Sequence, residues 1–296
     1  MTACLPPLVE RLLARGPVVL DGAWGTELQA LGLALGECPD VWNLSHPERV
    51  LSVARAYVEA GSDVILTNTF RANRIALEGA GLGASVREVN RAGVEISRRA
   101  AEGRALVFAS IGPSGRLLAA GETDENALRE AFEEQAAGLV EAGADALVIE
   151  TMSDPDEAAI AVAAARETGL PTVACMVFDS GPDGDRTMTG ATVETALRAV
   201  LDAGADVIGS NCGQGVEGFA SLCARMRAVT DRPIWIKANA GLPELDGARV
   251  VYPATPERFA GEIPGLLRAG AGFVGGCCGT SPPFVAAVRR AVDRAR

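Results

Sequence analysis

The chain has 296 residues, of which 48% are hydrophobic and 22% charged, and its formal net charge is −11. This length suits two average domains or one α/β barrel, and it is enough to bury a large core. A chain this acidic repels polyanions, so we expect neither nucleic acid nor an anionic membrane surface as a partner. The N-terminal segment has no long apolar stretch, so we expect no signal peptide, no membrane span and a cytoplasmic location.

Eight apolar runs typical of β-strands alternate with helical patterns along the chain. We predict strands at residues 17–22, 62–70, 105–115, 144–152, 171–178, 205–212, 233–241 and 271–279. Amphipathic helical segments follow these runs, among them residues 47–61, 84–103, 125–143, 155–169, 192–204, 216–229, 255–270 and 281–295. Strands that alternate with helices favour parallel pairing. Eight such units predict an α/β fold, a (β/α)8 TIM barrel that occupies residues 1–296 as a single domain.

A doubly wound open sheet is the alternative fold. It would normally carry a G-x-G-x-x-G turn after its first strand, where this chain has DGAWGTELQ. Four related segments, EAGSDVI, EAGADAL, DAGADVI and RAGAGFV, precede the second, fourth, sixth and eighth predicted strands. In each, a helix ends at a glycine, which suits a left-handed helix end. These short loops mark one end of the barrel, so the residues that end the strands lie at the other.

The chain has one histidine, His46, in the segment NLSHPERV. Ser45 and Glu48 have the spacing of a capping box, and Pro47 suits the first turn of a helix. We therefore interpret His46 as an incidental residue at a helix N-terminus. A mechanism that needs both a histidine base and a histidine ligand is excluded.

Three of the seven cysteines fall at predicted strand ends, where the active sites of such barrels lie. Cys212 ends the sixth strand, and Cys277 and Cys278 end the eighth. The adjacent pair could be a strained disulfide, two small residues in a glycine-rich bend, or part of a metal site. Reduced thiols are expected in the cytoplasm, and the addition of Cys212 favours a Zn²⁺ site. Three sulfur ligands leave an open fourth position, which is typical of catalytic zinc.

An open zinc centre with three cysteine ligands suits a substrate thiol. Zinc lowers the pKa of a thiol, and three thiolates keep the bound sulfur nucleophilic. We therefore expect alkyl transfer to a substrate sulfur, with Cys212, Cys277 and Cys278 as the catalytic metal ligands. The alternative is a structural or redox site in a barrel that only docks a corrinoid partner.

Four motifs, GGCCGTSP, GSNCGQG, DGAWGTELQ and LTNTFRAN, resemble the homocysteine S-methyltransferase family over about residues 19–283. The resemblance implies a zinc-binding (β/α)8 barrel in which homocysteine accepts a methyl group. It implies that Cys212, Cys277 and Cys278 bind the zinc. It also implies a substrate site in which Glu150 pairs with the homocysteine ammonium and the amino acid end is held by Asp21, Gly22 and Ala23.

A further segment, IKANAGLPELDGARVVYP, resembles the homocysteine module of cobalamin-dependent methionine synthase more than the branches with small-molecule donors. This resemblance implies that Asn239 lies close to the zinc. A cobalamin signature Asp-x-His-x-x-Gly is absent because Leu44 stands two positions before His46, and the eight strands leave no length for a folate barrel.

The methyl donor must therefore come from outside this chain. The candidates are a methylcorrinoid on a separate protein, S-methylmethionine or S-adenosylmethionine, and a betaine. In the expected reaction the zinc-bound homocysteine thiolate attacks the donor methyl group and forms methionine. The alternative purpose is demethylation of a catabolic donor such as a betaine, with homocysteine as the acceptor.

Overall fold

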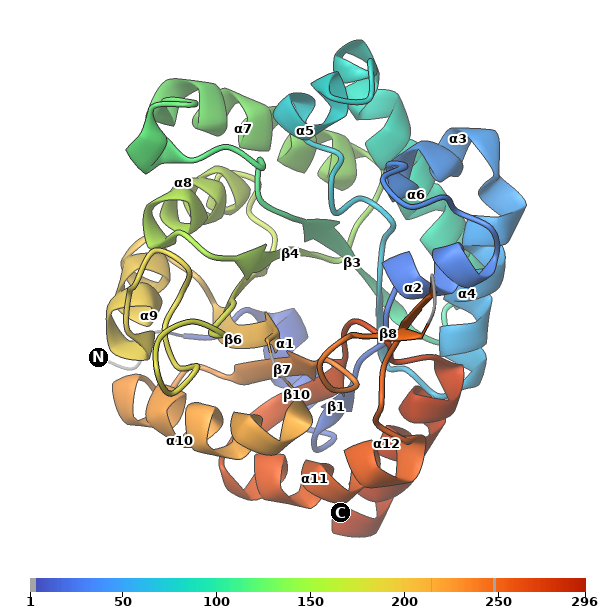
Figure 1. The fold of residues 1–296 in the computed structure, drawn as a ribbon, viewed down its shortest axis with the longest axis vertical. Coiled ribbons are helices and arrows are strands. Elements are labelled where there is room, and N and C mark those ends of the chain that lie inside the picture. The colour runs from blue at the N-terminus through green and yellow to red at the C-terminus, as the bar shows by residue number, and fades with distance from the viewer. Residues whose placement is uncertain (1–3, 214, 247–248) are drawn as a thin grey trace.

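The computed structural model describes residues 4–213, 215–246 and 249–296, and it contains one eight-stranded parallel sheet ringed by helices (Figure 1). The order around the sheet is β1-β10-β7-β6-β5-β4-β3-β2. Its strands are β1 (Val18–Val19), β2 (Val64–Leu66), β3 (Leu106–Ile111), β4 (Ala146–Met152), β5 (Thr172–Met176), β6 (Val207–Cys212), β7 (Ile234–Ala238) and β10 (Ala271–Gly276). Each lies within one of the eight predicted runs, so the (β/α)8 barrel is confirmed.

Helices follow the strands on the outside of the barrel, except for the first helix, which precedes β1 and lies across the centre of the barrel in Figure 1. They are α1 (Pro7–Leu13), α2 (Gly25–Ala30), α3 (Trp42–Ser45), α4 (Pro47–Glu59), α5 (Arg74–Glu78), α6 (Val86–Ala101), α7 (Glu125–Glu141), α8 (Pro155–Arg166), α9 (Val193–Asp202), α10 (Phe219–Val229), α11 (Pro256–Arg268) and α12 (Pro282–Ala295). Short 3₁₀ turns lie at η1 (Pro39–Val41), η2 (Gly83–Ser85), η3 (Leu118–Ala120) and η4 (Val216–Gly218). In the described part of the chain, no helix is both long and apolar enough to cross a membrane.

The two outermost strands of the sheet, β1 and β2, are joined mainly through one aspartate. The backbone N–H of Asp63 donates to the carbonyl oxygen of Val19 at 2.7 Å, and the backbone N–H of Val19 donates to the Asp63 carboxylate at 2.8 Å. Asp63 also pairs with Arg289 of α12. These contacts bring the edge strands together and nearly close the barrel.

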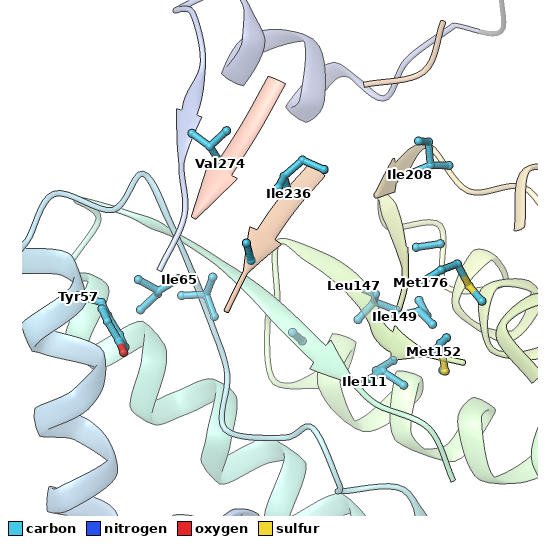
Figure 2. Packing of buried hydrophobic residues seen from close by; sticks show 14 of the residues in the cluster. Tyr57, Ile65, Ile111, Leu147, Ile149, Met152, Met176, Ile208, Ile236 and Val274 are labelled. Carbon is cyan, nitrogen blue, oxygen red and sulfur yellow. The ribbon is translucent and has the colours of Figure 1, made fainter. Parts of the chain in front are cut away.

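The core has two layers, because alternate residues of each strand point to opposite faces. Outward side chains such as Ile65, Ile149 and Ile236 pack against the helices (Figure 2). Inward side chains form a separate apolar cluster in which the ring of Trp235 lies 6.0 Å from Phe108 and 5.3 Å from Phe273. Helix α1 packs against this cluster and lies across the centre of the barrel in Figure 1.

Two local features differ from the sequence-based predictions. Residues after β7 form a short antiparallel pair, β8 (Glu244–Asp246) and β9 (Arg249–Val251), which the sequence analysis did not predict. The predicted capping box at Ser45 is wrong. Ser45 ends α3, where its hydroxyl donates to the carbonyl of Val41, and α4 begins without a side-chain cap at His46. The helix break between Ser45 and Pro47 leaves Ser45 too early to cap α4.

Candidate metal centre and substrate cavity

The sulfurs of Cys212, Cys277 and Cys278 meet at the C-terminal end of the barrel. All three Sγ atoms lie within 4.8 Å of one another, and those of Cys212 and Cys277 are 3.0 Å apart. The cysteines are free and half-buried. Hydrogen bonds from the thiols of Cys212 and Cys277 lower the pKa of Cys278. The pKa of Cys212 is raised by its hydrogen bonds with Cys277 and Cys278 and by burial. Within the described ranges, these residues form the one cluster of three or more metal-ligating side chains.

Strand ends around the cysteines have a strained backbone. Cys212 and Thr151 adopt left-handed φ angles of 61° and 62°, which non-glycine residues rarely do. Asn211 holds both turns: its Oδ1 accepts from the N–H of Thr151 at 2.8 Å, and its Nδ2 donates to the Thr151 hydroxyl at 2.7 Å. Such strain persists only where surrounding contacts impose it, and it is concentrated at functional sites.

Asn239, at the end of β7, connects the two cysteine loops. Its Oδ1 accepts from the backbone N–H of Cys278 at 3.0 Å, and its Nδ2 donates to the carbonyl of Gly213 at 2.7 Å. Both ends of the amide are therefore used to hold Cys212 and Cys278 in place. Asn239 lies next to the sulfur cluster, as the sequence implied, and its contacts there are with the backbone.

The loop after β1 is bonded to the loop that carries Cys277 and Cys278. The N–H of Ala23 donates to the carbonyl of Thr280 at 2.9 Å, and the Tyr57 hydroxyl donates to the carbonyl of Ala23 at 2.6 Å. A Cβ at Gly22 would lie 2.4 Å from the Thr280 oxygen, so only glycine permits this approach. The DGAWG and GGCCGTS motifs are therefore parts of one packed unit.

A cavity of about 280 Å³ opens beside the sulfurs. Its volume suits a molecule of amino acid size, somewhat smaller than a typical drug-sized ligand. It is lined by Gly22, Ala23, Trp24, Gly25, Thr26, Pro39, Asp40, Leu66, Thr67, Asn68, Phe70, Ser110, Glu150, Thr151, Cys212, Lys237, Cys277 and Cys278. The cavity thus places the three sulfurs, a set of apolar walls and several charged groups around one small space.

Glu150 is the predicted ammonium partner, and its side chain lines this cavity. It is 7% exposed, and its Oε1 accepts from the Ser110 hydroxyl at 2.5 Å. Burial raises the pKa of Glu150 to about 7, although the nearby Lys237 acts in the opposite direction. A carboxyl group with this pKa can change its charge near neutral pH.

Asp21 is fully buried and already has three donors. Its Oδ2 accepts from Trp24 Nε1 at 2.8 Å and from the N–H of Leu66 at 2.7 Å, while its Oδ1 pairs with Lys237 Nζ at 2.5 Å. Asp21 is not among the described residues that line the cavity, whereas its neighbours Gly22 and Ala23 are. The structure therefore brings Gly22, Ala23 and Glu150 to the cavity and leaves Asp21 outside it.

Sequence reasoning missed Lys237, Ser110 and Asp40 as residues of the cavity. Lys237 had a detectable signal, because a lysine two positions after a tryptophan in a buried strand points to the same face as that tryptophan. Asp40 is 1% exposed, accepts from the N–H of Arg71 at 2.9 Å, and has a pKa raised to about 6 by burial. Its position in the short 3₁₀ turn η1 gave no comparable signal.

The chain is similar to known proteins in both sequence and fold. A model of the family described as homocysteine S-methyltransferase matches residues 18–292. The methionine synthases of Mycobacterium leprae and Mycobacterium tuberculosis are each 31% identical over 95% of this chain, which spans only 25% of their length. The homocysteine methyltransferase MmuM from Escherichia coli, in its metallated form, superposes with a TM-score of 0.79 at 23% identity, over 95% of this chain and 99% of that one.

The structural match establishes the barrel fold, and the family model covers nearly all of it. The motifs that carry the resemblance, around Asp21, Cys212 and Cys277, all lie within the matched residues. The chain belongs to the homocysteine S-methyltransferase family.

Proposed function

We propose that this chain transfers a methyl group from an external donor to the sulfur of homocysteine and so forms methionine, with zinc held by Cys212, Cys277 and Cys278. The observation that supports this proposal is the cluster of three sulfurs beside a cavity of amino acid size. All cysteines of the described chain are free. Three thiols stay reduced in the cytoplasm, where we propose that the protein acts.

The three cysteines fit a zinc ion by the separation and type of their donor atoms. Tetrahedral zinc with Zn–S bonds of about 2.3 Å requires sulfurs about 3.8 Å apart. The three sulfurs all lie within 4.8 Å of one another, close enough to surround one ion. An all-sulfur donor set favours zinc over magnesium or calcium. When bound there, zinc would lower the pKa of a substrate thiol and thereby keep it ionised at neutral pH.

The protein's own residues bind and orient the amino acid end of the substrate. The Glu150 carboxylate would receive the ammonium, since it is the predicted partner and reaches the cavity. The loop at Gly22 and Ala23 would contact the remainder of this end. Asn239 would act as a positioning residue, because it fixes the loops of Cys212 and Cys278 relative to each other. Buried walls exclude water and hold the sulfur for in-line transfer.

One observation bears on the donor. Identity to the two methionine synthases favours a methylcorrinoid carried outside this chain. The alternative is a small free donor such as S-methylmethionine, S-adenosylmethionine or a betaine. All of these carry a methyl group on a good leaving atom, so transfer needs no general acid. With a betaine as the donor, the same site would serve donor catabolism.

The proposed function predicts that homocysteine adds a sulfur ligand to bound zinc. Zinc X-ray absorption of the loaded protein should show three sulfur neighbours without substrate and four with homocysteine. Homoserine, which has a hydroxyl in place of the thiol, should leave the count at three. An unchanged sulfur count would contradict the proposal. If homocysteine does add a sulfur ligand, a panel of donors offered to the same preparation identifies the one that yields methionine.

The raised pKa of Glu150 predicts that substrate recognition depends on pH. Its carboxyl has a pKa of about 7 and faces Lys237, Asp21 and Cys277. As pH falls through this value the carboxylate is protonated and no longer attracts the ammonium. The preference for homocysteine over 4-mercaptobutyrate, which lacks the amine, should therefore fall about tenfold between pH 8 and pH 6.

This comparison isolates Glu150, because both thiols lose the same proton on binding zinc. Dissociation constants measured by calorimetry with each ligand give the preference at every pH. The variant Glu150→Gln should show a low preference at all pH values. A wild-type preference that does not change with pH would exclude Glu150 as the ammonium partner.

A further inference from the structure

Lys237 is a buried cation at the base of the substrate cavity. Its side chain is 2% exposed, and it is the one cationic side chain that lines the cavity in the described parts of the chain. Burial acts to lower its pKa, but the carboxylates of Asp21 and Glu150 outweigh this and raise it. Lys237 therefore carries a positive charge in a space that would also receive a substrate ammonium.

The strand arrangement directs this charge toward Asp21. Lys237 of β7 is in register with Gly275 of β10, and β10 separates β7 from β1. A Cβ at Gly275 would lie 2.6 Å from the Cβ of Leu20 and 2.8 Å from the carbonyl oxygen of Asp21. Glycine thus lets β1 approach closely, and the lysine crosses β10 to pair with Asp21 at 2.5 Å.

Asp21 has no accessible oxygen left for a substrate. Trp24 and Leu66 donate to one oxygen and Lys237 to the other, and the residue is 0% exposed. Glu150 differs in each respect, because it lines the cavity and its Oε2 has only a long contact of 3.5 Å, from Asn211 Nδ2. Of the two carboxylates near the lysine, only Glu150 can reach a bound amino acid.

We propose that Lys237 is the specificity-determining residue that decides which carboxylate receives the substrate ammonium. The Lys237 ammonium pairs with the Asp21 carboxylate, so Asp21 serves only to support the loop after β1. Glu150 is then the one carboxylate that binds the amino group of the substrate. This inference rests on the proposed function, since it assumes that an amino acid thiol enters the cavity. In this inference, Lys237 pairs with Asp21 and thereby prevents the substrate ammonium from binding there.

The test compares binding of homocysteine and 4-mercaptobutyrate to zinc-loaded protein by calorimetry at pH 8. The wild type should prefer homocysteine by about tenfold or more, the range expected for a hydrogen bond between charged groups. Glu150→Gln should lose this preference. Asp21→Asn keeps an oxygen that accepts from Lys237, and it should retain the wild-type preference within about twofold.

A double variant and a triple variant test the inference independently of the single variants. In Lys237→Met/Glu150→Gln the Asp21 carboxylate is released, so the preference for homocysteine should return. Adding Asp21→Asn to this double variant should remove the preference for homocysteine again. Circular dichroism verifies that each variant is folded. These variants measure ligand choice, which a purely structural ion pair would not alter.

The outcomes separate the two proposals. Loss of the preference in Asp21→Asn, with binding otherwise intact, would show that Asp21 contacts the ammonium and would overturn this inference alone. No return of the preference in the folded Lys237→Met/Glu150→Gln protein would also overturn it. Failure of the wild type to bind either thiol would overturn the proposed function and, with it, the role of Lys237.

Discussion

Replacement of Cys277 by alanine is expected to abolish zinc retention and methyl transfer while the barrel remains folded. Cys277 lies 3.0 Å from the sulfur of Cys212, and its loss leaves only Cys212 and Cys278 as ligands. Changes in residues that merely support a ligand reduce metal affinity by about 10–100-fold, so loss of a ligand should exceed this range. Metal analysis after dialysis against a chelator, together with an activity assay, measures both effects.

A matched control for this variant is Cys223→Ala. Cys223 is also a free cysteine, but it is buried in α10, where its thiol donates to the carbonyl of Ala269. This variant should keep its full zinc content. Equal zinc content in Cys277→Ala and Cys223→Ala would show that Cys277 is not a zinc ligand.

Replacement of Asp21 by alanine is expected to destabilise the fold by about 3–5 kcal/mol. The change removes the partner of a lysine that is 2% exposed and also leaves Trp24 and the N–H of Leu66 without their acceptor. Removing one member of a buried ion pair typically has this effect, because the remaining charge is left unpaired in a poorly solvated place. Equilibrium unfolding in urea gives the free energy of unfolding for each variant.

The double variant Asp21→Asn/Lys237→Met tests the electrostatic cause. It removes both charges and keeps an oxygen that accepts from Trp24 and Leu66, so it should be more stable than Asp21→Ala. A double variant as unstable as the single one would indicate that packing, rather than the unpaired ammonium, dominates. The two single changes should be non-additive, since the groups are in direct contact.

Local sequence patterns were sufficient for the order of the strands of the barrel and for the clustering of the three cysteines. Strand signals and the glycine-ended helices place Cys212, Cys277 and Cys278 at strand ends, and parallel strands bring those ends to one face of the barrel. The family resemblance, rather than a local pattern, pointed to Glu150 and the Gly22 loop, which line the cavity. The hairpin of β8 and β9 was missed because its short segments, Glu244–Asp246 and Arg249–Val251, contain charged residues and form no apolar run.

By itself, the sequence determined the barrel and the clustering of three sulfurs, since both follow from periodicity and from which residues end each strand. Only the tertiary structure decided how the charges beneath those sulfurs are paired. Asp21, just after β1, and Lys237, in β7, are 216 residues apart, and β10 separates these two strands. Their contact depends on the register of β7 with β10 and on the close approach of β1 at Gly275. Neither the register nor the approach is encoded in a local pattern, because both arise from packing between strands distant in the chain.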